Sequence, residues 1–281
     1  MINSINTKLL GSIWAILVLT PTANATGFEI LAPHRAVYEV KLQKAEDRSG
    51  IEGMQGRIVY ELRGNECDGI AINYRFVTRI NTGREVFVTD QQSASYESPD
   101  GREFSFSTKS FVNEQADQQI KGSAVRSEGG LTVTHDGVNP RELNLERGLF
   151  TTSHLIEVMK NAIEGEAFVA HTVFDGSGEA DKVLNSASVI GKAKVVKELL
   201  EGEVEDGIEE LRSEEAWPIT MSYFNTDSDN TAEALPIYEA SFLLYRNGVS
   251  RDLIMRYPDY ALKASLTDIE YYERPPCKIE N

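Results

Sequence analysis

The stretch GIAINYRFVTRI, residues 69–80, decides the fold class. Ile70, Ile72, Tyr74 and Phe76 alternate with small, polar or charged residues, so the large apolar side chains share one face of an extended segment. This period of two indicates a half-buried β-strand. Short Gly, Asn, Asp or Pro turn signals separate further segments with the same alternation, at 34–43, 55–64, 84–97, 102–111 and 118–127. The sequence therefore predicts a succession of antiparallel strands joined by tight turns.

One predicted helix, TSHLIEVMKNAIE at 152–164, interrupts the strands. Leu155, Ile156, Met159 and Ile163 form an apolar stripe, residues 151–153 can supply a cap, and Gly165 can end the helix. We expect this helix to pack against the concave face of the sheet.

Strands resume after the helix, at 166–174, 183–192, 217–224, 236–257 and 260–273. Within the fourth of these, Asn247-Gly248 predicts a hairpin with a type I′ turn, which needs positive φ at both central positions. The chain has no internal repeat and no Pro/Gly/Ser-rich linker. One β domain over residues 26–281 is therefore favoured over two small domains.

The first 25 residues are typical of a secretory signal peptide. Lys8 precedes an apolar run from Leu9 to Thr20, Pro21 follows it, and Ala23 and Ala25 suit cleavage before Thr26. The apolar run is too short to span a bilayer. We therefore expect a soluble mature protein outside the cytoplasm, in a bacterial periplasm.

The chain is acidic, with 44 Asp and Glu against 28 Lys and Arg and a formal net charge of −16. Such a charge disfavours binding to nucleic acid or to anionic lipid surfaces, so no nucleic-acid partner is predicted. Nine of the acidic residues lie within 198–215. The segment 197–216 is predicted to be an exposed excursion, helical in part, either as a solvated loop or as an arm that binds a partner.

The sequence contains two cysteines, Cys67 and Cys277, and both remain after removal of the leader. In an oxidising compartment two thiols without a competitor are expected to pair. Closing a loop of roughly 210 residues removes about 5 kcal/mol of unfolded-state entropy in the chain model. A redox-active pair is the alternative, which the lack of a C-x-x-C motif disfavours.

The stretch HTVFDGSGEADK, residues 171–182, has the composition of a binding loop. As a calcium loop starting at Asp175 it has Ala180 where a sharp turn needs glycine and Ser186 where a bidentate glutamate belongs. It lacks the Gly-Lys-Ser/Thr of a phosphate loop and the G-x-S-x-G of a nucleophile elbow. The favoured interpretation is an inter-strand turn, with a weak cation site or a catalytic serine as alternatives.

A second candidate calcium loop, NTDSDNTAE at 225–233, has Asn230 at the glycine position and is interpreted as a solvated loop. The histidines, His34, His135, His154 and His171, form neither H-x-x-x-H nor H-E-x-x-H, so no metal site is predicted. We expect His154 to be a cap or surface group and His171 to lie on a strand. No motif assembles catalytic residues, and no cofactor is predicted; an envelope hydrolase is the third hypothesis.

Several segments together resemble the EipB family of periplasmic cell-envelope integrity proteins from alphaproteobacteria. They are FTTSHLIEVMKNAIEGE, FVAHTVFDGSGEADKV, SVIGK, AWPITMSYF and YEASFLLYRNGVSRDLIMRYPDYALKASLTDIEYYE. The resemblance covers about residues 28–278. It implies a long, twisted antiparallel sheet that forms a β-spiral or broken barrel around the helix, similar in shape to the lipoprotein carriers LolA and LolB, with Cys67 and Cys277 as the family's disulfide. The acidic segment does not match the pattern.

The function that the resemblance implies is maintenance of the cell envelope without catalysis. We therefore expect a non-enzymatic protein that binds another envelope protein, in the periplasm or at the outer membrane. The alternative is a carrier of a lipid or of a lipoprotein acyl chain, if the curved sheet encloses a cavity. That alternative competes with an interior filled by side chains such as Phe76, Phe104 and Phe242. The sequence gives no ligand-binding residue and no oligomeric state.

Overall fold

The structure is a computed structural model that describes residues 27–137, 140–205, 208–226 and 235–277. The predicted signal peptide, residues 1–25, lies outside the described residues. Within them, fifteen strands form one sheet, and neighbouring strands pair antiparallel, including β1 with β2 and with β15. The strands of the first half are β1 (His34–Ala45), β2 (Gly53–Asn65), β3 (Gly69–Asn81), β4 (Val86–Glu97), β5 (Glu103–Val112), β6 (Gln115–Ser127), β7 (Gly130–His135) and β8 (Arg141–Leu145).

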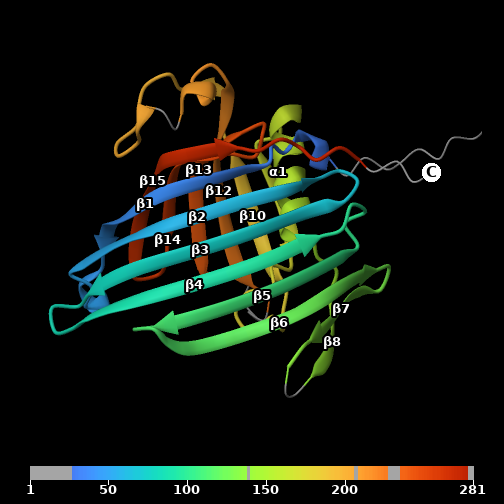
Figure 1. Ribbon diagram of the computed structural model, residues 1–281, viewed down its shortest axis with the longest axis horizontal. Helices are drawn as coiled ribbons and strands as arrows, with labels where there is room; N and C mark the ends of the chain where they lie inside the picture. Colours follow the sequence, from blue (N-terminus) through green and yellow to red (C-terminus); the bar gives the residue numbers. More distant parts are fainter. Residues whose placement is uncertain (1–26, 138–139, 206–207, 227–234, 278–281) are drawn as a thin grey trace, which may run out of the picture.

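The second half holds the helix and the remaining strands. They are α1 (Thr151–Glu164), β9 (Phe168–Val173), β10 (Leu184–Ile190), β11 (Lys194–Val195), β12 (Glu215–Asn225), β13 (Tyr238–Tyr245), β14 (Ser250–Arg256) and β15 (Tyr260–Tyr271), with short 3₁₀ turns at η1 (Phe28–Ile30), η2 (Asp47–Ser49) and η4 (Glu209–Leu211). The pairing of β1 with β15 joins the two halves. In Figure 1 the long strands β1–β6 cross in front of the steeper strands β12–β14, and α1 lies beside β10.

The sheet curls into a broken barrel around α1. Ile156 and Met159 of the helix are buried against Leu62 of β2, Ile219 of β12 and Leu244 of β13, which lie on opposite walls of the curl. Within the described residues, one isolated parallel bridge brings the two ends of the sheet together, between Leu149 in the connection after β8 and Val173 of β9. Apart from that bridge the sheet stays open, which confirms the all-β broken barrel around one helix.

The hairpin at Asn247-Gly248 is confirmed, but its predicted turn type is wrong. Gly248 has φ 88°, whereas Asn247 does not lie in the positive-φ region. The Gly248 N–H donates to the carbonyl of Tyr245 at 2.9 Å, and Tyr245 donates to Val249 at 2.9 Å. This is a three-residue connection in which a type I turn is followed by a left-handed glycine. A Cβ at Gly248 would come within 2.8 Å of Leu31, so glycine is also required by packing.

The buried face of the helix is shifted from the predicted stripe, although Ile156 and Met159 are buried as expected. Ile163 is 39% exposed, while His154, Val158 and Ala162 are buried. The expectation that His154 is a cap or surface group is therefore wrong: its side chain lies within the core at 3% exposure. The stripe is shifted because the N-terminal segment, through Phe28 and Leu31, also packs in the cluster that contains the helix.

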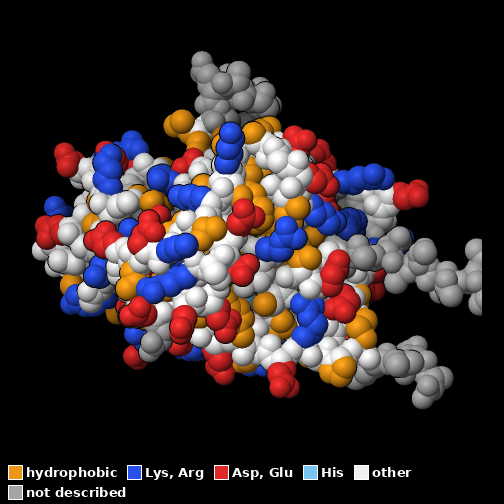
Figure 2. Space-filling model, turned by 90° about the horizontal axis from the view of Figure 1, so that it is seen from above, with side chains coloured by type: hydrophobic (Ala, Val, Ile, Leu, Met, Phe, Trp, Pro, Cys, Tyr) orange, Lys and Arg blue, Asp and Glu red, His pale blue; other side chains and the backbone are white. Residues whose placement is uncertain are grey.

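The acidic segment, residues 197–216, is only partly the exposed excursion expected. Most of its carboxylates are exposed, and acidic and basic side chains are interspersed on the face seen from above (Figure 2). Glu203, however, is 1% exposed and forms a salt bridge with Arg251, which is fully buried. Ile208 and Leu211 are buried in the same core as β1 and β15. The segment therefore covers one end of that core, and only its outer surface is solvated.

The buried guanidinium of Arg251 fixes the path of the acidic segment. It donates to both carboxylate oxygens of Glu203, at 2.8 and 2.5 Å, and to the carbonyls of Val196 and Glu198. A further bond goes to the hydroxyl of Tyr245 at 2.9 Å. A buried charge is costly unless it is paired and hydrogen-bonded, so these contacts hold the segment in place.

Candidate functional site

A cavity lies inside the curl, between the concave face of the sheet and the start of α1. Its volume is about 260 Å³. Its walls come from β2 to β5, α1 and the loop after β9, and they are mostly apolar: Tyr60, Leu62, Ile72, Tyr74, Ser93, Ala94, Ser95, Phe106, Thr108, Thr151, Thr152, Leu155, Asp175 and Ser177. Side chains also fill much of the interior, with Phe76 and Phe104 buried and Phe242 partly buried, but the lumen remains beside them.

Tyr60 and Tyr74 bring phenol groups to the lumen, beside the hydroxyls of its serine and threonine residues. Burial raises the pKa values of Tyr60 and Tyr74 well above the usual range, so both phenols are neutral. Both residues line the cavity. Outside the cavity lining, the ring of Tyr238 stacks on that of Tyr223, with 5.9 Å between the ring centres, and lies 5.1 Å from that of Tyr257. The lumen therefore offers apolar contact with a few hydroxyl donors.

The loop between β9 and β10 forms part of the cavity mouth. Asp175 and Ser177 line the cavity, and the Asp175 carboxylate accepts a hydrogen bond from the Ser177 N–H at 2.9 Å. Phe174, Ala180 and Val183 are buried against β5–β7. The stretch 171–182 is thus a connection between strands, as expected, but it is not only a solvated turn. It packs across the gap between the two ends of the sheet.

A buried carboxylate positions the helix beside the cavity. Glu97, at the end of β4, accepts hydrogen bonds from the backbone N–H groups of Thr152 and Ser153, at 3.0 and 3.2 Å, and from the Ser153 hydroxyl. The first backbone N–H groups of a helix have no partner within the helix itself, and a negative charge is favourable at that end. Burial nevertheless raises the pKa of Glu97. The predicted cap from residues 151–153 is wrong, because Phe150 is the N-cap residue and makes no side-chain cap.

Glu97 has no local sequence signal as a cap, since it lies more than fifty residues before the helix. Only the fold brings the two together.

Polar side-chain atoms without partners lie on α1, β9 and β10. His171 is directly opposite Ser186 in the strand register, and the His154 ring lies 5.4 Å from the His171 ring. Within the described residues the buried atoms that lack a hydrogen bond here are Thr151 Oγ1, His154 Nε2, His171 Nδ1, Ser186 Oγ and Ser188 Oγ. Such groups are normally satisfied by ordered water or by a ligand.

The histidines do not assemble a metal site or a triad in the described part of the chain. His34 is bonded to the carbonyl of Ala32, and His135 to that of Ala180. His154 and His171 face each other, and burial lowers the pKa of His154 to about 4, helped by the neighbouring His171. Both rings are therefore neutral at pH 7, because burial lowers the pKa of His171 as well.

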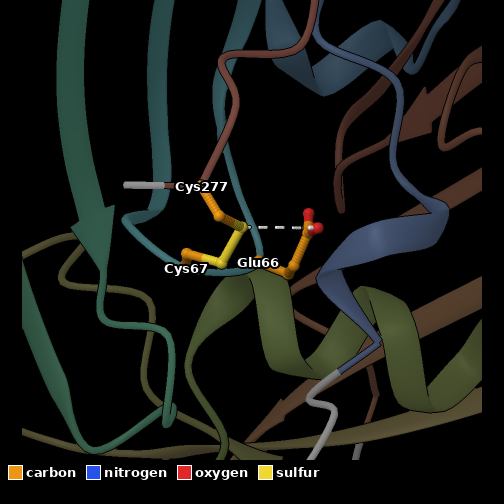
Figure 3. Close-up of side chains that lie close together, drawn as sticks. All are labelled: Glu66, Cys67 and Cys277. Atoms are coloured by element: carbon orange, nitrogen blue, oxygen red, sulfur yellow. Dashed lines mark hydrogen bonds between the residues drawn. A yellow bond between two sulfur atoms is a disulfide. The ribbon is translucent and has the colours of Figure 1, made fainter. Parts of the chain in front are cut away.

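The two cysteines, Cys67 and Cys277, form a disulfide in the structure, with 5.5 Å between their Cα atoms (Figure 3). Glu66 lies beside it, with Oε1 3.7 Å from the Cys277 sulfur. This trio is the one close group of three potential metal ligands among the described residues. It does not fit a metal ion, because the two sulfur atoms are bonded to each other and Glu66 pairs with Arg274 at 2.9 Å. The loop 225–233 falls mostly on residues 227–234, which lie outside the described residues.

The chain is similar to a known protein family, to a named relative and to a solved structure. The EipB-like family matches residues 25–273. The Cell envelope integrity protein EipB of Brucella abortus (strain 2308) is 35% identical over 252 residues, which cover 89% of this chain and 88% of that protein. A solved structure of a beta-barrel-like protein of the domain of unknown function DUF1849, also from Brucella abortus, aligns with a TM-score of 0.80 at 34% identity. The alignment covers 86% of this chain and 99% of the other.

In the described residues no helix combines the length and the apolar character needed to cross a bilayer. The family match spans nearly all of the chain, and the fold, the helix and the relative agree with it. The chain belongs to the EipB-like family, and its relative is a cell-envelope integrity protein.

Proposed function

We propose that the chain is a non-catalytic periplasmic protein that maintains cell-envelope integrity by binding another envelope protein. The observation that carries the proposal is the 35% identity to a cell envelope integrity protein over 89% of the chain. The signal-peptide pattern before Thr26 supports secretion to the periplasm.

The arrangement of side chains supports a binding role over catalysis. His154 and His171 contact each other, and His154 also contacts the ring of Tyr223, with no carboxylate bonded to either imidazole in the described part of the chain. A general base of the triad type needs an acidic group that orients the imidazole. The hydrolase hypothesis therefore gains no support from this cluster.

Crosslinking in living cells tests the proposal. A photo-reactive residue on the outer face of the sheet should give defined adducts with envelope proteins, identified by mass spectrometry, and the deletion strain should become sensitive to envelope stress. If envelope stress yields no adduct and deletion causes no sensitivity, the proposal is wrong.

A carrier of a lipid or lipoprotein acyl chain is the second candidate, favoured by the mostly apolar lumen. The volume of about 260 Å³ lies just below the usual range for small-molecule sites of roughly 300–1,000 Å³. The lumen can therefore enclose only part of a long acyl chain without rearrangement. Native mass spectrometry of protein purified from periplasm should show an added lipid mass if this candidate is right, and Leu155→Trp, which narrows the lumen, should remove it. Unliganded protein under the same conditions would count against the carrier role.

A further inference from the structure

The open edge of β9 has backbone groups available for another strand. Leu149 donates its N–H to the carbonyl of Thr172 and accepts from the N–H of Phe174, both at 2.8 Å. Thr172 therefore points its backbone groups away from β10. On the opposite side of the strand, the N–H of Ile190 donates to the carbonyl of Ala167 at 2.9 Å. The backbone N–H and C=O groups of the odd-numbered residues of this strand therefore point towards β10.

The alternation of the strand places the N–H and C=O groups of Phe168 and Ala170 on the same open edge as those of Thr172. Within the described residues, no backbone or side-chain group bonds to these positions of Phe168 and Ala170. The bridge at Leu149 occupies only the far end of the edge. An unpaired edge of this kind is a template for an added strand.

A groove runs along this edge. Its volume is about 900 Å³, and Ala170, His171 and Thr172 form one side of it. The other side comes from the turns at 100–102 and 126–128 and from the connection 147–149. The small side chain of Ala170 leaves the edge accessible, so an extended segment can approach the backbone there.

Three arginines line the groove. Arg126 donates to the carbonyl of Gly101 and lies over the ring of Phe150, and Arg147 donates to the carbonyl of Glu128. Arg102 is 3.9 Å from the carboxylate of Asp100, which is already bonded to Ser98.

In the described part of the chain, the hydrogen bonds of Arg126 and Arg147 go to carbonyl oxygens and not to carboxylates. Guanidinium groups in this situation keep donors for an incoming carboxylate. The lining carries three positive against two negative side chains, in a chain whose net charge is −16.

Apolar side chains flank the edge on its outer face. Phe168 is 58% exposed and Val189, its cross-strand partner on β10, is 57% exposed. Side chains of an added strand alternate between the two faces, so every second one can contact this pair.

We propose that the β9 edge, defined as the open backbone edge of residues 168–172, binds an extended acidic segment of an envelope protein by adding it to the sheet as a further strand. Backbone hydrogen bonds to Phe168, to Ala170 and to the N–H of Thr172 give affinity, because the Thr172 carbonyl is already bonded to Leu149. Arg102, Arg126 and Arg147 select acidic side chains. This inference rests on the proposed function and names the partner chemistry and the surface.

A peptide selection tests the proposal with the disulfide-bonded mature chain. A random library of eight-residue peptides displayed on phage is selected on the protein, and the best peptide is synthesised for fluorescence-anisotropy titration. Selected sequences should be enriched in Asp and Glu and should lack Pro. Ala170→Pro should weaken binding at least tenfold because it removes an edge N–H. Ala170→Thr, which keeps that N–H, should stay within about threefold.

Charge variants separate the arginines from a general charge effect. Arg147→Glu should weaken the peptide at least tenfold, Arg147→Lys should retain most binding, and Lys109→Glu, the same charge change on exposed β5, should leave affinity unchanged. Should Ala170→Pro fail to fold, N-methylation of alternate peptide residues gives the same test. One methylated set should abolish binding, and the other should not.

The results separate this inference from the proposed function. Two results would overturn the β9 edge as the docking site. One is a set of selected peptides without acidic enrichment, and the other is an affinity that neither Ala170→Pro nor either methylated set changes. A crosslinked envelope protein on another surface would then leave the proposed function intact. In a deletion strain, Ala170→Thr should restore envelope integrity and Ala170→Pro should not; equal rescue by both would also overturn the inference.

Discussion

The buried histidine of α1 makes the stability of the protein depend on pH. His154 is 3% exposed, and burial together with the neighbouring His171 lowers its pKa from 6.5 to about 4 in the folded state. The unfolded chain therefore binds a proton at His154 at a higher pH than the folded chain does. A depressed histidine pKa contributes stability near pH 7 that is lost as the pH falls below 6.5 towards 4.

The size of the effect follows from the two pKa values. The pKa of His154 is 6.5 in the unfolded chain and about 4 in the folded chain. From this residue alone, the free energy of unfolding is therefore lower than at pH 7 by about 2 kcal/mol at pH 5 and by about 3 kcal/mol at pH 4. Burial also lowers the pKa of His171, so this neighbour acts in the same direction. A loss of this size is a large fraction of a typical domain stability of about 5–15 kcal/mol.

Substitution of His154 by leucine removes the titration and also the unpartnered Nε2 atom. Urea unfolding of wild type and His154→Leu at pH 7, 6 and 5 should show that the variant loses about 2 kcal/mol less than wild type between pH 7 and pH 5. The matched control is Val158→Ala, a buried position on the same helix. It should lower the unfolding free energy by about 2 kcal/mol at every pH and leave the pH dependence unchanged. Identical pH dependence in wild type and His154→Leu would refute the reasoning.

Three further changes test other contacts. Cys67→Ser and Cys277→Ser should lower the melting temperature by similar amounts, and the double variant should lose no more than either single one; additive losses in calorimetry would mean that the thiols are not partners. Glu97→Ala leaves the N–H groups of the first helical turn without a carboxylate and should cost about 2 kcal/mol in urea unfolding, whereas an unchanged midpoint would exclude a capping role. Glu203→Gln leaves the Arg251 charge buried and unpaired, so we expect a loss of about 3–5 kcal/mol and easier proteolysis within 197–216; wild-type protease resistance would contradict the anchoring role of this pair.

Local patterns in the sequence predicted most of the elements. The strands with clear alternation, such as β2 and β3, and the helix were found close to their positions, since apolar periodicity reports burial on one face. β7 and β8 were missed as separate strands because they are short, 130–135 and 141–145. The Asn247-Gly248 hairpin was found, but its turn type depends on backbone angles that the dipeptide alone does not fix.

The candidate sites depended on contacts between distant residues. Nothing near Glu97 in the sequence marks it as the cap of α1, and nothing near Arg251 marks it as the partner of Glu203. His154 looked like a surface group because it lies next to a helix start. It is buried because β9 and the N-terminal segment both pack on that side of the helix.

By itself, the sequence determined the all-β class, the single helix, the connecting role of 171–182 and the resemblance to its family, because these depend on short-range periodicity and on motifs. The tertiary structure alone decided which strands lie at the two ends of the sheet, and therefore which backbone edge is open. It also decided that the loop after β9 and residues of β2 to β5 enclose a lumen of about 260 Å³. The physical reason is that an unpaired edge and a cavity are properties of how distant segments fit together. Hydrogen-bond partners and packing neighbours of that kind leave no mark on the residues next to them in the chain.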